Sequence, residues 1–525
     1  MDTRRKSGFI DIVYSCPEQC DSYLEIITYY IKIYSYNTMD KIIGVLFGST
    51  FLFATTVVVT DYLASIHLIL VYLLLIMIVA NCYDHNQHDH ISAILSLQMV
   101  IIFSLGIMII SLFSGGFGFR IFELVVVFTL ISVLVFARAD FVQIFPNYFP
   151  YFTAFAVLFG IFLYHAHSLP TDSGMGLFPV FAGVFLAFNL FVVPQYVSQD
   201  AFYWSVSIVA TIAAIFGVLA IVYGDLSIWI FEVRTWSNEV SLIFVDQEVP
   251  VIRSIFANPN TLGLLLFPGV VTSMIATHRT FVRSSFPILA VVPASCLIIT
   301  TVGLYLSNSR ASIGAAIIAI TLYGIIIMNR RFAPVAILCA GAGVTAFLGG
   351  VSVSILPVDP ANRFVLWQAG FDMIQAEGSL FGEGLISTRD AIEPYLDGNG
   401  GAVHNSYLSI FIRTGFFGGL VYLVLTLGPI CHGMIRYTRV NIGMLALASS
   451  FAIHQLFEGY TLYQFGPGSV LGALTVGYVI KSITVPTEQP MRASIKASVK
   501  NVFPSNEPFE YSRDQHQAGD PDRQS

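Results

Sequence analysis

The feature that most constrains this chain is a series of long apolar stretches that recurs through almost its whole length. Between residues 41 and 480 we find about fourteen stretches of roughly 20 mainly apolar residues, the length that an α-helix needs to cross a bilayer. Charged residues make up 11% of the chain, against roughly 25% in soluble domains. We therefore predict an all-α fold, a polytopic membrane bundle of about 14 (12–14) transmembrane helices with two long outward-facing loops.

The predicted spans divide the chain into three parts. A polar N-terminal tail, residues 1–40, precedes the transmembrane domain, residues 41–480. Residues 481–525 are rich in Ser, Gln, Asp, Pro and Arg, a composition that cannot bury a core, so we expect a disordered tail there. The spans are expected near residues 41–60, 62–80, 91–113, 119–137, 141–164, 177–193, 201–223, 260–277, 286–306, 311–328, 332–354, 404–428, 440–457 and 466–480.

Lys and Arg in the tails and the short loops fall on one predicted side of the membrane. With an even number of spans both tails lie on that side, which is the cytoplasm by the positive-inside rule. The long loops, residues 224–257 and 355–403, then face outward from a multi-pass protein of the cytoplasmic membrane. The basic residues that set this orientation are Arg4, Arg5, Lys6, Lys32, Lys41, Arg138, Arg279, Arg283, Arg330, Arg331, Arg436, Arg439, Lys481, Arg492, Lys496 and Lys500.

The first candidate residue is an arginine that stands just before a predicted outward-facing helix start. Arg253 comes before F-A-N-P-N-T-L-G, in which Asn258 can cap the helix and Pro259 fits its first position. Capping alone explains the Asn and Pro, and Asn260 is a supporting candidate in the same motif. A cation near a helix N-terminus opposes the helix dipole. Arg253 therefore needs an anionic partner, either Glu248 or a phosphate.

Two further arginines stand at expected outward-facing positions. Arg310 follows L-S-N-S and opens a span, while Arg363 opens the amphipathic run R-F-V-L-W-Q-A-G-F-D-M-I. An interfacial Arg often only reaches lipid headgroups, so this alternative stays open for both. A binding role is the other interpretation, because the planar guanidinium suits bidentate phosphate contact.

His404 is the strongest candidate for acid–base chemistry. It begins an outward-facing helix after the flexible G-N-G-G run, and the helix N-terminus disfavours imidazolium. A neutral His can accept a proton at pH 7; the alternative is a structural His bonded to Asn405 or Tyr407. Asn405 and Glu458 are supporting candidates. Ionisable residues inside a membrane are functional candidates by default, although Glu458 could equally pair with one of the arginines.

Arginines and a histidine gathered at one face suit the transfer of a group from a phosphate-linked lipid. A transporter of such a lipid is the main alternative, but it would place its charges near the bilayer midplane within broken helices. The motif D-H-N-Q-H-D-H, residues 84–90, has metal-ligand residue types but falls in a predicted cytoplasmic loop. We expect a solvated turn there, and no acidic pair suggests a metal site elsewhere.

The combined order of these motifs resembles the O-antigen ligase and polymerase superfamily. The resemblance rests on N-P-N-T-L-G after an Arg, S-N-S-R-A-S-I-G, R-x-x-x-W, L-F-G-E-G and H-N-S-Y-L followed by G-F-F-G-G. It runs from about Arg253 to Gly419, within a ligase-like core of about residues 200–480.

The resemblance implies a metal-independent, membrane-embedded glycosyltransferase of the C type, without a cofactor, in surface polysaccharide assembly. Such enzymes transfer a glycan from a polyprenyl-diphosphate donor to an acceptor hydroxyl on the outer side of the membrane. Arg253 and Arg363 would bind the diphosphate, Arg310 has a less defined role, and His404 would deprotonate or orient the acceptor. The expected partners are the lipid-linked donor, membrane lipids and a lipid, glycan or protein acceptor, with no nucleic acid. Ligase, polymerase and O-linked protein oligosaccharyltransferase stay open, as does a flippase.

The predicted topology can be tested by cysteine-accessibility labelling in intact cells. A cysteine substituted for Asp397 should react with a membrane-impermeant reagent, because residues 355–403 are expected outside, whereas cysteines in the tails should be protected. A tail that reacts from outside, or a residue 397 that does not react, would contradict the orientation.

Overall fold

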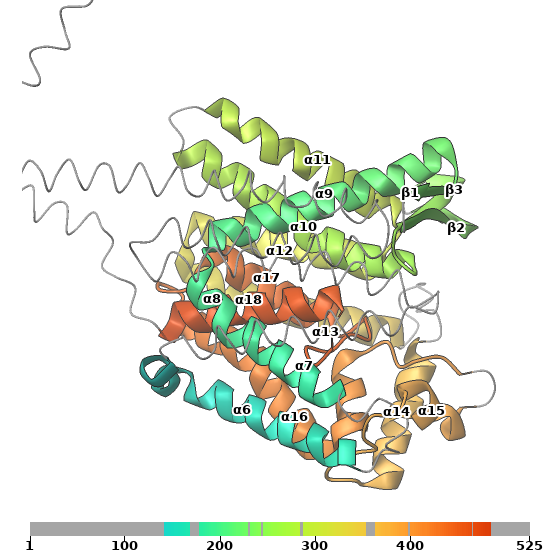
Figure 1. Ribbon diagram of the computed structural model, residues 1–525, viewed down its shortest axis with the longest axis vertical. Coiled ribbons are helices and arrows are strands. Elements are labelled where there is room, and N and C mark those ends of the chain that lie inside the picture. Colours follow the sequence, from blue (N-terminus) through green and yellow to red (C-terminus); the bar gives the residue numbers. More distant parts are fainter. Residues whose placement is uncertain are drawn as a thin grey trace, which may run out of the picture. The chain divides into compact units, whose positions relative to one another are not determined.

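The computed structural model of the chain describes residues 141–167, 178–228, 231–242, 245–283, 287–352, 363–396, 400–464 and 466–484, which are mostly helical (Figure 1). The predicted N-terminal tail, the four spans expected between residues 41 and 137, the motif at 84–90 and residues 485–525 lie outside these ranges.

Every span predicted after residue 140 coincides with helical structure. The elements are α6 (Phe141–His167), α7 (Phe178–Ala187), η3 (Phe188–Val192), α8 (Val193–Tyr196), α9 (Gln199–Tyr223), β1 (Leu226–Ile228), β2 (Phe231–Leu242), β3 (Val245–Ser254), α10 (Pro259–Arg283), η4 (Pro287–Ala290), α11 (Val291–Leu306), α12 (Arg310–Met328), η5 (Arg330–Phe332), α13 (Ala333–Ser352), α14 (Arg363–Glu377), α15 (Thr388–Ile392), η6 (Glu393–Tyr395), α16 (Ser406–Ile435), α17 (Ile442–His454) and α18 (Pro467–Thr484).

Among the described residues, seven helical stretches are long and apolar enough to cross a membrane, by length and composition. They lie in α6, α9, α10, α11 with η4, α12, α13 with η5, and α16. The stretch from α7 to α8 and helix α17 are shorter apolar helices, and the π-helical turn η3 interrupts the former. The chain is thus a multi-span helical protein, and the total of about 14 spans stays a prediction.

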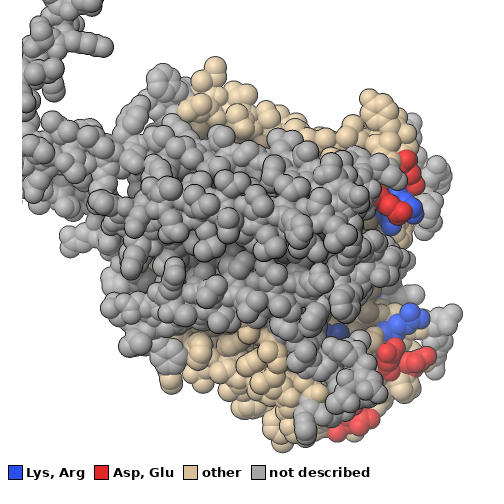
Figure 2. Space-filling view, in the orientation of Figure 1, with Lys and Arg blue, Asp and Glu red and all other residues tan. Residues whose placement is uncertain are grey.

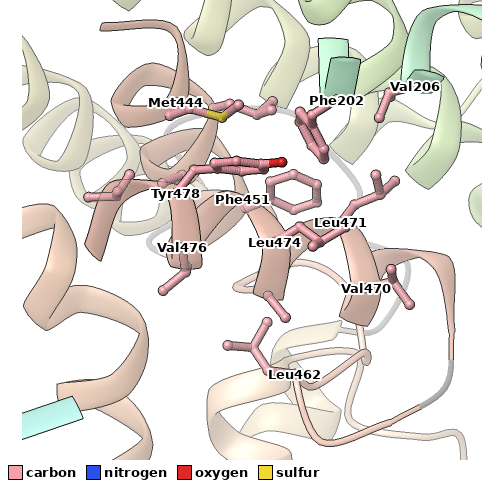
Figure 3. Packing of buried hydrophobic residues seen from close by; sticks show 14 of the residues in the cluster. Phe202, Val206, Met444, Phe451, Leu462, Val470, Leu471, Leu474, Val476 and Tyr478 are labelled. Atoms are coloured by element: carbon pink, nitrogen blue, oxygen red, sulfur yellow. The ribbon is translucent and has the colours of Figure 1, made fainter. Parts of the chain in front are cut away.

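The main core is formed by aromatic and aliphatic side chains from helices that are distant in sequence. Figure 3 shows Phe202 of α9, Phe451 of α17 and Tyr478 of α18 packed with Leu471 and Leu474, all at most 1% exposed. Lipid is as apolar as these side chains, so association in a bilayer depends on close packing and interhelical hydrogen bonds. This core joins α9, α17 and α18.

The segment expected as an outer loop at 224–257 contains an antiparallel sheet with strand order β1-β2-β3. On β2, exposed Glu232 is followed by Val233, which is fully buried, and Ile252 of β3 is fully buried as well. Alternating burial of β-branched residues is the pattern of a half-buried strand. The strands were not predicted, because acidic and aromatic residues interrupt the alternation, and the outward-facing position of the segment stays a prediction. The sheet packs on α9, where a side chain at Gly217 would meet Ile252.

The second expected outer loop, 355–403, is organised around the predicted amphipathic helix α14. Its apolar side chains form a small cluster with α15 and the start of α16. The buried members are Leu366, Ala369, Met373, Ala391, Ile392, Val403, Leu408 and Ile412. The indole of Trp367 donates a hydrogen bond to the carbonyl of Val403 at 3.0 Å. Trp367 therefore helps to dock α14 on the segment before α16.

The L-F-G-E-G motif packs against a kink in α16. Gly415 has a φ of 69° and interrupts the helix, and the amides of Glu383 and Gly384 donate to the carbonyls of Ile412 and Arg413 at 2.9 and 2.8 Å. A side chain at Gly415 would collide with the backbone of Leu380. The glycines of both motifs thus allow two backbone segments to touch, which is a structural role.

The charged side chains visible in the space-filling view lie toward one edge, where the strands and helices α14 and α15 are found (Figures 1 and 2). We call this the site end of the bundle, defined by the starts of α10, α12, α14 and α16.

Gly415→Ala should destabilise the protein by about 1–3 kcal/mol, since alanine is strained at positive φ and its Cβ would meet the Leu380 backbone. Gly314→Ala in α12 is the matched control because nothing lies within 4 Å of a Cβ there. Thermal unfolding of both variants in the same detergent checks this; equal melting temperatures would refute the close-contact role.

Candidate functional site

The candidate site is organised by the segment Gln455–Tyr460, which follows α17 and which we call the linking segment. Arg363, the first residue of α14, donates through Nη1 to the Phe457 carbonyl and through Nη2 to Glu458 Oε1 at 3.3 Å. The side chains of Arg363 and Glu458 are 22% and 12% exposed. One of the two alternatives for Glu458, pairing with a candidate arginine, is therefore realised with Arg363.

The same segment holds the beginning of α16. The amide of Ser406 donates to the Gln455 carbonyl at 2.8 Å. Its hydroxyl lies within hydrogen-bond distance of the carbonyls of Glu458, at 2.6 Å, and Tyr460. Asn405 is the N-cap, and its Oδ1 accepts from the amide of Leu408 at 3.0 Å, which satisfies a free helical N–H group. The start of α16 is thus fixed by two independent sets of contacts.

His404 lies just before the helix rather than at its start. Its φ is 47°, in the left-handed region, and α16 begins at Ser406, so the predicted helix start at residue 404 was wrong. Asn405 takes the capping role because its short side chain reaches back to the helical amides. A Cβ placed on Gly459 of the linking segment would lie 3.6 Å from His404 Cα. His404 therefore neighbours the segment that holds Arg363.

Burial, and then the charge of Arg363, lower the pKa of His404 from its ordinary value of 6.5. Both effects disfavour the imidazolium, so the ring is neutral at pH 7 as predicted. The predicted cause, the helix N-terminus, is not the leading one. For Glu458, burial raises the carboxyl pKa while Arg363 opposes that rise.

Arg253 lies at the end of β3, next to the start of α10. Its Nη1 donates to the Ala257 carbonyl at 3.2 Å, and its Nε is buried without a hydrogen-bond partner. Asn258 caps α10 as predicted, with Oδ1 accepting from the Thr261 amide at 2.8 Å. Asn260 is half-buried in the first turn. The side chain of Glu248, the alternative partner of Arg253, lies outside the described part.

Arg310 is the exposed first residue of α12. The preceding Ser309 does not cap the helix, and its hydroxyl donates instead to Ser312 Oγ at 2.9 Å. A Cβ on Gly263 of α10 would collide with Ser309 and Ser312. The starts of α10 and α12 are therefore packed together, and the glycine of N-P-N-T-L-G allows that approach.

A contact from α12 to α17 completes the path to the linking segment, because Ser312 Oγ lies 3.0 Å from Nε2 of His454, the last residue of α17. All predicted site residues thus belong to one end of the bundle. Within the described ranges, an ion pair joins Arg363 to Glu458, and the charge of Arg363 acts on His404. Asn405 is linked to them through its chain neighbour Ser406, whose hydroxyl bonds to the Glu458 carbonyl. No hydrogen bond or ion pair described there joins Arg253, Asn260 or Arg310 to that group. Their helix starts are linked to α17 through the packing of Gly263 on Ser309 and Ser312 and through the contact of Ser312 with His454.

Backbone strain coincides with the candidate residues. Positive φ in non-glycine residues occurs three times in the described chain, at Ser254 (56°), Asn308 (49°) and His404 (47°). Ser254 follows Arg253, Asn308 lies two residues before Arg310, and His404 is itself a candidate. Such conformations cost about 1–3 kcal/mol each and cluster at functional sites. The strain singles out the three segments that the motifs had indicated.

Buried polar residues behind the linking segment were not predicted as site residues. His454, Gln455 and Ser312 are at most 2% exposed, and the Tyr422 hydroxyl donates to Gln455 Oε1 at 2.7 Å. Their signal in the sequence is a polar side chain within or next to an apolar stretch, which alone does not reveal a partner. Among the residues that the structure describes, no group of three or more His, Cys, Asp or Glu is arranged to bind a metal.

These features define a multi-span membrane protein in which guanidinium groups and a neutral imidazole gather at one end of the helices. Residues 295–423 match the family described as O-antigen ligase, which confirms the resemblance. The match includes Arg310, Arg363, His404 and Asn405, whereas Arg253, Asn260 and Glu458 lie outside it. The family implies transfer of a lipid-linked glycan by a glycosyltransferase in surface polysaccharide assembly. No curated protein matches the chain.

Arg363→Ala should destabilise the protein by about 1–3 kcal/mol, because the largely buried Glu458 loses its cation. Adding Glu458→Gln should recover part of that loss, since the amide carries no charge. Thermal unfolding of the single and double variants measures the recovery. The control is Arg330→Ala, because the Arg330 guanidinium binds the Thr438 carbonyl instead. There the effects of Arg330→Ala and Glu458→Gln on the free energy of unfolding should add. If the effects of Arg363→Ala and Glu458→Gln add as well, the ion pair does not contribute to stability.

Proposed function

We propose that the protein transfers a glycan from a polyprenyl-diphosphate-linked donor to an acceptor hydroxyl at the outer face of the cytoplasmic membrane. The observation that carries the proposal is that Arg363 and His404 adjoin the same linking segment, Arg363 through Phe457 and Glu458 and His404 beside Gly459. A cation for a phosphate and a base for a hydroxyl are the two groups that such a transfer requires.

Arg363 binds the donor's diphosphate in this proposal. A guanidinium has five N–H donors, and the two bonds to the linking segment leave three for phosphate oxygens. Arg253 and Arg310 supply further positive charge at the neighbouring starts of α10 and α12. Fixed cations of this kind stabilise the negative charge that develops on the leaving diphosphate. The proposed mechanism therefore assigns that charge stabilisation to arginines.

His404 acts as the general base. Its neutral ring takes the proton of the acceptor hydroxyl as the oxygen attacks the anomeric carbon. The bond from that carbon to the diphosphate oxygen breaks, and its electron pair leaves with the diphosphate. Asn405 and Glu458 act indirectly, Asn405 by capping α16 and Glu458 by orienting Arg363.

The distribution of charge favours a transferase over a flippase of the same lipid. The candidate cations stand at the starts of helices, and the stretch interrupted by η3 (Phe188–Val192) contains no charged residue. The kinked helix α16 carries Arg413 two residues before Gly415, in its second and third turns rather than at its middle. A transporter is expected to place charged groups in broken helices near the midplane. The orientation of this end toward the outside rests on the positive-inside pattern.

His404→Ala should abolish transfer while leaving donor binding nearly intact, because the base acts on the acceptor in the transition state. Arg253→Ala and Arg363→Ala should also weaken donor binding, by about 1.5–3 kcal/mol each.

In the wild type the acidic limb of the pH–rate profile should have its midpoint below pH 6.5, since the lowered pKa keeps His404 neutral to lower pH. Turnover and donor binding by purified protein measure these effects.

His432→Ala is the matched control, a histidine near the C-terminal end of α16 that bonds to Tyr151. A His404→Ala protein with normal turnover would show that His404 is not the base.

The glycan phenotype of a gene deletion distinguishes between the possible acceptors. Single repeat units on the acceptor indicate a polymerase, and long chains left on polyprenyl diphosphate indicate a ligase. Normal surface glycan with an unmodified protein indicates an oligosaccharyltransferase. Movement of lipid-linked glycan across vesicles without transfer would refute the enzyme proposal.

A further inference from the structure

A buried chain of polar side chains leads from the start of α12 to the linking segment. Ser309 Oγ donates to Ser312 Oγ at 2.9 Å, and Ser312 Oγ lies 3.0 Å from His454 Nε2. His454 Nδ1 lies 3.2 Å from the hydroxyl of Tyr460. Both serines and His454 are 0% exposed and Tyr460 is 7% exposed. Both ring nitrogens of His454 are thus used inside the protein, one toward α12 and one toward the linking segment.

The linking segment connects this chain to the candidate site. His454 immediately precedes the segment and bonds to Tyr460, its last residue. The backbone of the segment receives Arg363 at Phe457, and the start of α16 at Gln455, Glu458 and Tyr460. A shift of the segment would therefore move the guanidinium and the beginning of α16 together.

We infer that His454 is a positioning residue. Through the Tyr460 hydroxyl it sets the conformation of the linking segment, and the segment holds Arg363 and His404 in one fixed relation. The ring of Phe267 stacks on His454 with centroids 5.0 Å apart, so the imidazole cannot turn without disturbing the core. Catalytic groups need such support, because a displacement of about 1 Å can reduce a rate by about 100-fold.

A histidine that merely fills the core makes a different prediction. Asparagine places its amide near the position of Nδ1, whereas glutamine places its amide near the position of Nε2. If His454 acts through Tyr460, His454→Asn should keep much of the function, and His454→Gln should keep less. Tyr460→Phe, which removes one oxygen, should reproduce the His454→Phe defect, and the double variant should add nothing. A core-filling role predicts no such pattern.

The first experiment needs no enzymatic activity. In a chain whose six native cysteines are replaced by alanine, His404→Cys and Gly459→Cys form a disulfide reporter. A Cβ at residue 459 lies 3.6 Å from residue 404 Cα, which is compatible with a bridge. Oxidation with copper phenanthroline should cross-link the pair. Adding His454→Phe or Tyr460→Phe should slow cross-linking by about tenfold, the size of a coupling of about 1.4 kcal/mol.

Ser449→Ala is the matched control, a buried serine of α17 whose hydroxyl donates to the Leu445 carbonyl of the same helix; it should leave the cross-linking rate unchanged. An unchanged rate in both His454→Phe and Tyr460→Phe would overturn the inference. If His454→Phe does not fold, Tyr460→Phe and His454→Asn decide the question by the same measurement.

Turnover in the native cysteine background provides the second readout, which rests on the proposed function. His454→Phe and Tyr460→Phe should lower turnover by about 100-fold, and His454→Asn should restore most of it. Full turnover in Tyr460→Phe would also overturn the inference. A wild type that transfers no glycan would refute the proposed function alone, because the cross-linking rates still test the positioning role.

Discussion

The rest of the site depends on one interaction, the docking of the Arg363 guanidinium on the linking segment. Arg363 and Glu458 are 95 residues apart in sequence, and their pairing closes the large segment containing α14 and α15 onto the helical bundle. A largely buried charge without a partner is strongly destabilising, so α14 cannot leave its position cheaply. The linking segment also receives Ser406, so Arg363 and the start of α16 are held by the same segment. Charge pairing thus converts two distant segments into one site.

The two kinds of motif that indicated the family have different physical roles. The glycines of L-F-G-E-G and of the kink at Gly415 permit backbone contact between segments, and Gly263 permits the approach of α10 to α12. His404 and Arg363 instead present polar groups at the end of the bundle. A kink at Gly415 and a cap at Asn405 together fix the first turns of α16 from both sides. The glycines allow the segments to pack closely, and this packing positions the polar residues.

Local features of the sequence predicted much of the fold and part of the site. Apolar stretches of sufficient length gave the helices after residue 140, and local hydrogen bonding made Asn258 recognisable as a cap. The cap at Asn405 was not predicted, because the helix was expected to begin at residue 404. Non-local features were missed. The pairing of β2 with β3 depends on a partner strand, and the bond between His454 and Tyr460 depends on how α17 ends. The tertiary structure was also needed to show that Arg363, rather than another arginine, is the ion-pair partner of Glu458.

The charge of Arg363 meets two chemical requirements at once. An anionic diphosphate needs cations close to the reacting carbon, whereas a base must remain unprotonated in the same place. These demands conflict for most bases, since a bound anion raises the pKa of a neighbouring base. Burial and the Arg363 charge lower the pKa of His404, which opposes that rise. In the proposed mechanism, a cation fixed beside the imidazole attracts the donor and preserves the base, and this requires that both groups adjoin one segment.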